Sequence, residues 1–217
     1  MNTPSTPDQN LEHFTDRELF TKIWIHPRKV FRFIEAKKYD KFVYILLVLA
    51  GIVRGFDRAI DKNLGDKFSL IAILGLGIIV GGLFGWISYY IYAALLSWTG
   101  KWIGGRTDTR ALLRVLAYGS IPSIIALIFF IPQIGIYGIE LFRENGDLIE
   151  GTLIENMAFW GAVFLEMILA IWTLVLIIIG TAEVQNISIA NAILNLLLPI
   201  IVIVLPILII AGIFSVL

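Results

Sequence analysis

The sequence contains no cysteine. This absence excludes disulfide bonds, thiolate metal sites, thiol nucleophiles and the attachment of palmitate to the chain. Histidine is nearly absent too, because the only two, His13 and His26, lie in the polar N-terminal segment. The apolar remainder of the chain therefore has no histidine to serve as a catalytic base or a metal ligand.

Charged residues are also scarce, and they are unevenly distributed. They make up 16% of the 217 residues, against about 25% in an average soluble domain. Uncharged runs of 33, 25 and 34 residues lie between Lys67 and Lys101, between Arg114 and Glu140, and from Val184 onward. A hydrocarbon core about 30 Å thick is crossed by ~20 helical residues. We therefore predict an all-α, polytopic membrane protein.

The hydropathy pattern predicts a bundle of five transmembrane helices, covering residues 42-60, 70-98, 112-134, 156-179 and 191-214. The first helix is ambiguous, since only 12 uncharged residues, from Phe42 to Val53, precede Arg54. A run of that length is also typical of a re-entrant segment. We predict instead that the helix continues through the charged residues to about Ile60.

The N-terminal region divides into two parts. Residues 1-13 are rich in proline, serine, threonine and asparagine, which predicts a disordered tail. Residues 14-41 form a basic amphipathic segment that lacks the apolar centre of a cleavable signal peptide. We predict that this segment lies on the inner membrane surface, with four apolar side chains in lipid: Val30, Phe31, Phe33 and Ile34. The alternative is that the segment packs on cytosolic parts of its own chain.

The distribution of lysine and arginine predicts the orientation of the chain in the membrane. With five crossings, the segments on the N-terminal side hold 12 of these 17 residues, and the segments on the other side hold 5. Because positive charge accumulates in cytoplasmic loops, we predict a cytoplasmic N-terminus and a C-terminus outside. The formal net charge of zero gives no reason to expect binding to nucleic acid.

Motifs of soluble enzymes are missing from the sequence. It contains no Walker A sequence, no His-Glu-x-x-His metal motif and no Gly-x-Ser-x-Gly nucleophile elbow. We therefore predict a protein that is not an enzyme, with no catalytic residues, no metal site and no cofactor.

Three glycines, Gly77, Gly81 and Gly85, recur every four residues on one face of the second predicted helix. Their missing side chains allow another helix backbone to approach closely, and Gly51 and Gly55 repeat the spacing on the first helix. We expect this face to serve helix packing within one bundle. A homodimer interface and a narrow conduit are the two alternatives.

Four charged residues, Arg54, Asp57, Arg58 and Asp61, have a spacing that places them on one helix face. Glu166 is the one acidic residue of the fourth predicted helix, and it lies at nearly the depth of Arg54 when 1.5 Å is counted per residue. A lone carboxylate at mid-membrane costs at least ~2.5 kcal/mol. We therefore predict a buried polar centre in which Glu166 pairs with Arg54 or Arg58. Such a centre is either a structural ion pair or a site for protons, ions or lipid headgroups.

Pro122, Pro199 and Pro206 each lie inside a predicted span, where proline removes a backbone hydrogen bond. We predict a helix kink at each of these positions. Broken helices of the kind that line transporter binding sites are the alternative.

Four short motifs lie around the predicted spans. They are Trp24-Ile25-His26-Pro27, Gly104-Gly105, Ala117-Tyr118-Gly119-Ser120-Ile121-Pro122, and the stretch of residues 180-192. Over residues 14-217 this pattern resembles the Yip family, the Ypt/Rab-interacting membrane proteins, in its prokaryotic branch. The resemblance implies a five-helix membrane domain with a cytosolic N-terminus, in a bacterial cytoplasmic membrane, and it supplies no catalytic residue.

The same resemblance bears on function. Eukaryotic members bind Rab proteins and organise membrane traffic and shape, but their Asp-Leu-Tyr-Gly-Pro stretch is absent from this N-terminus, which argues against Rab binding. We expect a non-enzymatic protein that organises the lipid bilayer or binds a partner on its cytoplasmic side, with self-association through the face from Gly77 to Gly85. The alternative is a small transporter, channel or lipid-translocating protein that uses the polar centre.

Overall fold

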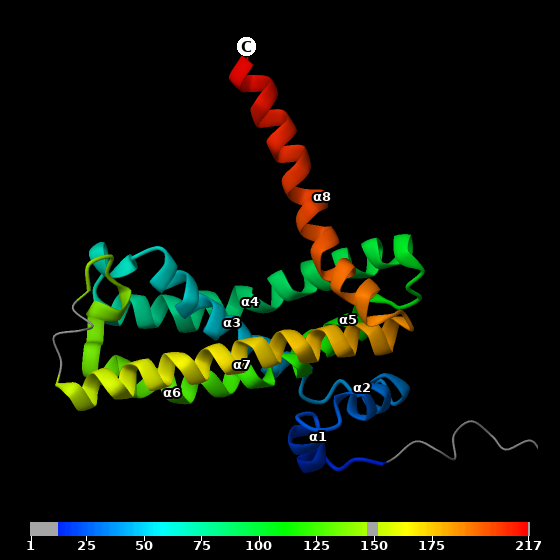
Figure 1. Cartoon of the computed structure of the whole chain (residues 1–217), viewed down its shortest axis with the longest axis horizontal. Helices are drawn as coiled ribbons and strands as arrows, with labels where there is room; N and C mark the ends of the chain where they lie inside the picture. Colours follow the sequence, from blue (N-terminus) through cyan, green and yellow to red (C-terminus); the bar gives the residue numbers. More distant parts are fainter. Residues whose placement is uncertain (1–12, 147–151, 217) are drawn as a thin grey trace, which may run out of the picture.

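Every regular element in the described part of the chain is a helix (Figure 1). The computed structural model describes residues 13-146 and 152-216, apart from the side chains of Glu155 and of residues 207-216. The α-helices are α1 (Asp16–Lys22), α2 (Pro27–Ala36), α3 (Val43–Asp61), α4 (Leu70–Gly100), α5 (Thr109–Gly119), α6 (Ile121–Tyr137), α7 (Leu153–Gln185) and α8 (Ile189–Val216). Three short 3-10 helices join them: η2 (Leu64–Asp66), η3 (Lys101–Ile103) and η4 (Gly138–Phe142). The predicted disordered tail lies outside the described residues except for His13.

Four segments of the described chain are long and apolar enough to cross a membrane. They are Leu70–Ile103, Thr109–Phe142, Asn156–Gln185 and Ile189–Pro206. α3 is not among them, because its second half carries two arginines and two aspartates. The all-helical membrane architecture is thus confirmed, whereas a fifth crossing by α3 stays a prediction.

α3 is one continuous helix from Val43 to Asp61. It does not turn back as a re-entrant segment would, and the predicted continuation of the helix through its charged half is confirmed. Its 19 residues extend over about 28 Å at 1.5 Å per residue.

Glycines bring α3 and α4 into backbone contact. A Cβ atom at Gly55 would lie 2.8 Å from the carbonyl oxygen of Gly77, and one at Gly81 would lie 2.7 Å from that of Gly51. A Cβ atom at Gly85 would collide with the Cα atom of Gly51. The glycine face of α4 is therefore occupied by α3 of the same chain, which leaves no room there for the alternative of a second copy.

The third predicted span is divided in two. α5 ends at Gly119 and α6 begins at Ile121, and the hydroxyl of Ser120 between them donates a hydrogen bond of 2.7 Å to the carbonyl of Leu116. Pro122 lies in the first turn of α6, where an N–H group would have no partner within the helix. Ser120 keeps a right-handed helical conformation, and residues 109-142 together are long enough for one crossing, so the kink at Pro122 stays a prediction.

α8 diverges from the other long helices. α3, α4, α6 and α7 lie along the long axis of the molecule, whereas α8 runs away from them steeply after the turn that joins it to α7 (Figure 1). Near its start α8 is held by Asn195, whose Nδ2 atom donates a hydrogen bond of 3.2 Å to the carbonyl of Leu96 in α4. Pro199 and Pro206 lie inside α8, which stays helical through both, so kinks at these two residues remain predictions.

α1 and α2 pack against one end of the bundle, the end where η3 and the α7–α8 turn also lie (Figure 1). We call this end the α2 end and the opposite end, with η2 and η4, the η4 end. The apolar face of α2 is buried in the main core against α5 and α7: Val30, Phe31, Phe33 and Ile34. The prediction that these side chains enter lipid is therefore wrong, because α5 and α7 cover them.

Candidate functional site

The four charged residues of α3 lie on the surface of the molecule. Arg54, Asp57, Arg58 and Asp61 are all exposed, and we call them the α3 stripe. The sequence predicted that these four residues form a buried centre, whereas the structure leaves them exposed. The reason is that α4 packs on the glycine side of α3, while α6 and α7 face another side, so that the charged face between them is uncovered.

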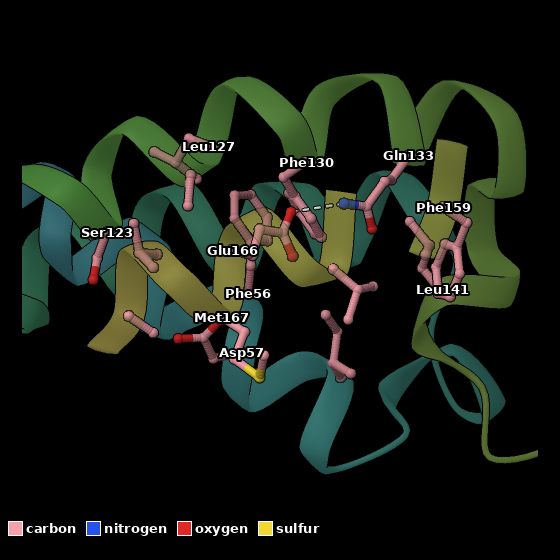
Figure 2. Close-up of a pocket in the computed structure, with 15 residues that line it drawn as sticks. Phe56, Asp57, Ser123, Leu127, Phe130, Gln133, Leu141, Phe159, Glu166 and Met167 are labelled. Carbon is pink, nitrogen blue, oxygen red and sulfur yellow. Dashed lines mark hydrogen bonds between the residues drawn. The ribbon is translucent and has the colours of Figure 1, made fainter. Parts of the chain in front are cut away.

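A cavity of about 380 Å³ lies between α3, α6 and α7. Four polar side chains line it: Asp57 from α3, Ser123 and Gln133 from α6, and Glu166 from α7 (Figure 2). The remaining lining residues are apolar: Val53, Phe56, Ile60, Ala126, Leu127, Phe130, Leu141, Phe159, Val163, Met167 and Ala170. An apolar cavity with a few convergent polar groups is the usual form of a small-molecule site.

Glu166 is half-buried in this cavity and is bonded to Gln133. The Nε2 atom of Gln133 donates a hydrogen bond of 2.6 Å to Oε1 of Glu166 (Figure 2), and Gln133 is only 6% exposed. Gln133 is not among the site residues predicted from the sequence. The signal was present, because Gln133 is the one polar residue in the apolar run between Ser123 and Tyr137.

A second cavity, of about 270 Å³, lies on the α4 side of α3. Arg54 and Arg58 line it together with Ser88 and the facing glycines of the two helices, and its lining contains no acidic residue. The guanidinium of Arg54 lies 4.8 Å from the centre of the Tyr89 ring, which is a cation–π distance. This groove therefore presents positive charge.

The ion pair predicted between Glu166 and Arg54 or Arg58 does not form among the described residues. Glu166 turns to Gln133 and Arg54 faces Tyr89, because Glu166 and the two arginines line cavities on different sides of α3. On α3, Asp57 thus lies toward α6 and α7, whereas Arg54 and Arg58 lie toward α4. In the described chain no group of three or more acidic or histidine side chains is placed to hold a metal ion.

A buried arginine joins the N-terminal helices to the bundle. Arg114 of α5 is 3% exposed, and its guanidinium donates hydrogen bonds of 2.8 Å to Glu35 and 3.2 Å to Asp40. Arg32 of α2 forms another ion pair, with Glu183 of α7, at 2.7 Å. In the sequence, Arg114 is visible only as the residue that precedes an uncharged run. The pattern does not predict that Glu35 and Asp40 lie beside it.

The outer surface at the α2 end is basic and aromatic. The exposed lysine and arginine side chains there include Arg28, Lys37, Lys38, Lys101, Arg106 and Arg110. Trp98 and Trp102 are also exposed, with their ring centres 5.0 Å apart in an edge-to-face contact, and Ile25 is 74% exposed. Basic and aromatic side chains are enriched where a membrane protein meets the headgroups.

Long apolar helices with apolar side chains on their outer surfaces define the class to which this chain belongs, that of helical integral membrane proteins. The family follows from comparison with known protein families. The Yip1 domain model matches residues 21–211, and the chain therefore belongs to the Yip1 family. Comparison with curated proteins and with solved structures gives no match. The resemblance drawn from four short motifs is thus confirmed at the level of the family.

Proposed function

We propose that this protein is a non-enzymatic organiser of the membrane, which holds a basic platform against the headgroups of the cytoplasmic leaflet. The platform consists of α1 and α2 with the exposed basic and aromatic side chains at the α2 end. One observation carries the proposal: the apolar face of α2 is buried against α5 and α7. The platform is therefore fixed rigidly to the apolar helices. Contacts between the platform and the headgroups are thus tied to the position of the whole bundle in the membrane.

The proposal includes five crossings, with the N-terminus in the cytoplasm and the C-terminus outside, in the cytoplasmic membrane of a prokaryote. The distribution of lysine and arginine supports this orientation. The crossing by α3 is supported by its length of about 28 Å and by its backbone contact with α4.

The attraction between this platform and the membrane is electrostatic. The apolar face of α2 is used for packing on α5 and α7, so it is not available for insertion into lipid. Each lysine or arginine held near an anionic membrane contributes about 1 kcal/mol, and the effect fades beyond ~10 Å at moderate salt. Because the platform binds one leaflet only, we expect it to favour a curved bilayer over a flat one. We expect this effect to weaken at high salt.

Reconstitution into liposomes tests this proposal. We expect the protein to reduce the mean diameter of vesicles that contain phosphatidylglycerol, as measured by electron cryomicroscopy, and to have little effect on purely zwitterionic vesicles. Replacement of three basic side chains of the platform, Arg28→Gln, Lys37→Gln and Lys38→Gln, is expected to remove the effect. The control, which removes two positive charges at the η4 end by Lys62→Gln and Lys67→Gln, is expected to retain it. Vesicle diameters that depend neither on anionic lipid nor on the platform would contradict the proposal.

Partner binding is assigned to the same surface. The exposed lysine and arginine side chains of the platform can bind an acidic protein on the cytoplasmic side. Such a protein would compete with headgroups for the same side chains. Self-association through Gly77, Gly81 and Gly85 forms no part of the proposal, because α3 occupies that face.

Translocation of lipids or small solutes is the second candidate function. The observation that favours it is the cavity in which Asp57 and Glu166 face apolar walls between three long helices. Flux measurements in liposomes, with a series of ions and labelled lipids, test this candidate. A translocator is expected to lose flux in Glu166→Gln, whereas a protein that only organises the membrane shows no flux with or without the substitution.

A further inference from the structure

We infer that the α3 stripe binds the headgroup of a zwitterionic phospholipid that carries an ammonium group and a phosphate. The ammonium group lies beside Asp57, at the opening of the cavity that also holds Glu166. The phosphate lies at Arg54, three residues away on the same exposed helix face, with Arg58 beside it. The inference rests on the second candidate function and specifies its ligand.

The larger cavity fits the ammonium end of such a lipid. Its lining contains two carboxylates, Asp57 and Glu166, and no lysine, arginine or histidine. The hydrogen bond from Gln133 engages one oxygen of Glu166, and no cationic side chain lines the cavity. A ligand group that enters here is therefore expected to be positively charged, and an ammonium group also supplies hydrogen-bond donors to carboxylates.

The walls and the opening of the cavity fit an acyl chain. Eleven of its fifteen lining residues are apolar, and a volume of about 380 Å³ lies in the usual range for a small-ligand site. The opening lies between α3 and α7, because Asp57 and Ile60 on one side and Met167 on the other are exposed. This part of the surface belongs to the apolar helices, where a lipid can enter sideways from the bilayer.

The groove beside the stripe, toward α4, fits the phosphate. Arg54 and Arg58 both line it and are both exposed, and no acidic residue shares the groove. Guanidinium groups bind phosphate oxygens with paired hydrogen bonds, which an ammonium group cannot do. Ser88 adds a hydroxyl donor to the same lining.

The spacing along α3 selects a ligand with both charges. Side chains three or four residues apart on a helix are neighbours at about 5–6 Å, so Asp57 lies beside Arg54, and Arg54 lies beside Arg58. A headgroup with adjacent ammonium and phosphate groups can neutralise the carboxylate charge and the guanidinium charge of α3 at the same time. A purely anionic headgroup would leave Asp57 and Glu166 without a cation, and a free amine would leave the arginines without an anion.

Quantitative lipid analysis of the purified full-length protein tests the inference. The protein is reconstituted in nanodiscs with equal amounts of phosphatidylethanolamine and phosphatidylglycerol of identical acyl chains, extracted gently, and its retained lipid is measured by mass spectrometry. We expect retention of phosphatidylethanolamine over phosphatidylglycerol by about tenfold, the ratio that corresponds to one charge-assisted hydrogen bond.

Two pairs of substitutions then identify the site. Asp57→Asn with Glu166→Gln, and separately Arg54→Gln with Arg58→Gln, are each expected to abolish the preference. Asp57→Asn alone is expected to reduce the preference for phosphatidylethanolamine. Because Asp57 is exposed, this substitution is expected to leave folding unchanged. Glu144→Gln and Lys62→Gln, which each remove one charge from an exposed residue outside both cavities, serve as controls and are expected to retain the preference. Equal retention of the two lipids, or a preference that survives both pairs of substitutions, would overturn the inference.

A translocation assay on the same variants separates this inference from the function on which it rests. Selective retention of phosphatidylethanolamine without movement of any labelled lipid or ion would support the headgroup site and contradict translocation. Flux that is lost in Glu166→Gln, in a protein that retains both lipids equally, would support translocation and overturn the headgroup site.

Discussion

At the scale of single residues, the contact between α3 and α4 depends on the absence of a methyl group. A Cβ atom at Gly81 would lie 2.7 Å from the carbonyl oxygen of Gly51, and backbone atoms cannot move aside as the end of a side chain can. We expect Gly81→Ala to lower the free energy of unfolding by about 1–3 kcal/mol, the usual cost of overpacking, and to lower the Tm measured in detergent. The matched control is Gly75→Ala, at a position on the same helix with open space around it, which is expected to be neutral or stabilising by up to ~1 kcal/mol. Equal effects of the two substitutions would contradict the packing argument.

The bond between Gln133 and Glu166 is the second test at this scale. Gln133→Leu removes the donor and leaves the Glu166 carboxylate in an apolar cavity with one bond fewer. We expect this variant to lose about 1–3 kcal/mol of stability, the cost of an unsatisfied polar group. Adding Glu166→Leu is expected to recover part of the loss, so that the double-mutant cycle gives a coupling energy above ~0.5 kcal/mol. Strictly additive losses, measured from the same unfolding curves, would show that the bond is not formed.

At the scale of helices, Arg114 holds α2 on the bundle. Its guanidinium is buried and reaches two carboxylates, Glu35 and Asp40, that are themselves partly exposed. Water weakens each pair, so we expect Arg114→Gln to cost about 1–3 kcal/mol rather than the larger sum for a fully buried cluster. Limited proteolysis between α2 and α3 should accelerate in Arg114→Gln and not in Arg110→Gln, which alters an exposed arginine of the same helix. Unchanged proteolysis in Arg114→Gln would show that the apolar contacts of α2 are sufficient by themselves.

α1 is expected to loosen in acid. The N–H of Thr15 donates a hydrogen bond of 2.9 Å to Glu18, and this bond, with those from Lys22 and the Thr15 hydroxyl, lowers the pKa of Glu18 to about 2. Because the folded pKa lies below the ordinary value of about 4.3, the stabilisation is complete above that value and is lost as the pH falls toward about 2. Hydrogen-exchange protection of the α1 amides should therefore fall over this window. In Glu18→Gln the fall should be smaller but not absent, since Lys41 and Tyr39 also lower the pKa of Asp16. An identical fall in Glu18→Gln would contradict this role for the Glu18 carboxylate.

At the scale of the whole molecule, the positions of the long helices follow from the sequence because bilayer thickness fixes how long an uncharged run must be. The sequence does not determine in the same way which helices, or whether lipid, cover each helix face. The apolar face of α2 has the same periodicity whether lipid or α5 and α7 cover it, so burial of Phe31 could not be deduced from the pattern. Likewise, the spacing of Arg54, Asp57 and Arg58 shows that they share a face, but only the packing of α4, α6 and α7 divides them between two cavities.

The absence of cysteine makes the crossing by α3 directly testable. Single cysteines introduced by Lys38→Cys and Lys62→Cys would stand at exposed positions just before and just after this helix. If α3 crosses with its start in the cytoplasm, a membrane-impermeant maleimide added to intact cells labels Lys62→Cys at once and labels Lys38→Cys only after permeabilisation. Labelling of both from the outside, or of neither, would place the two ends of α3 on one side. The platform and the η4 end would then share a compartment, which would contradict a crossing by α3 and the proposed topology of five crossings.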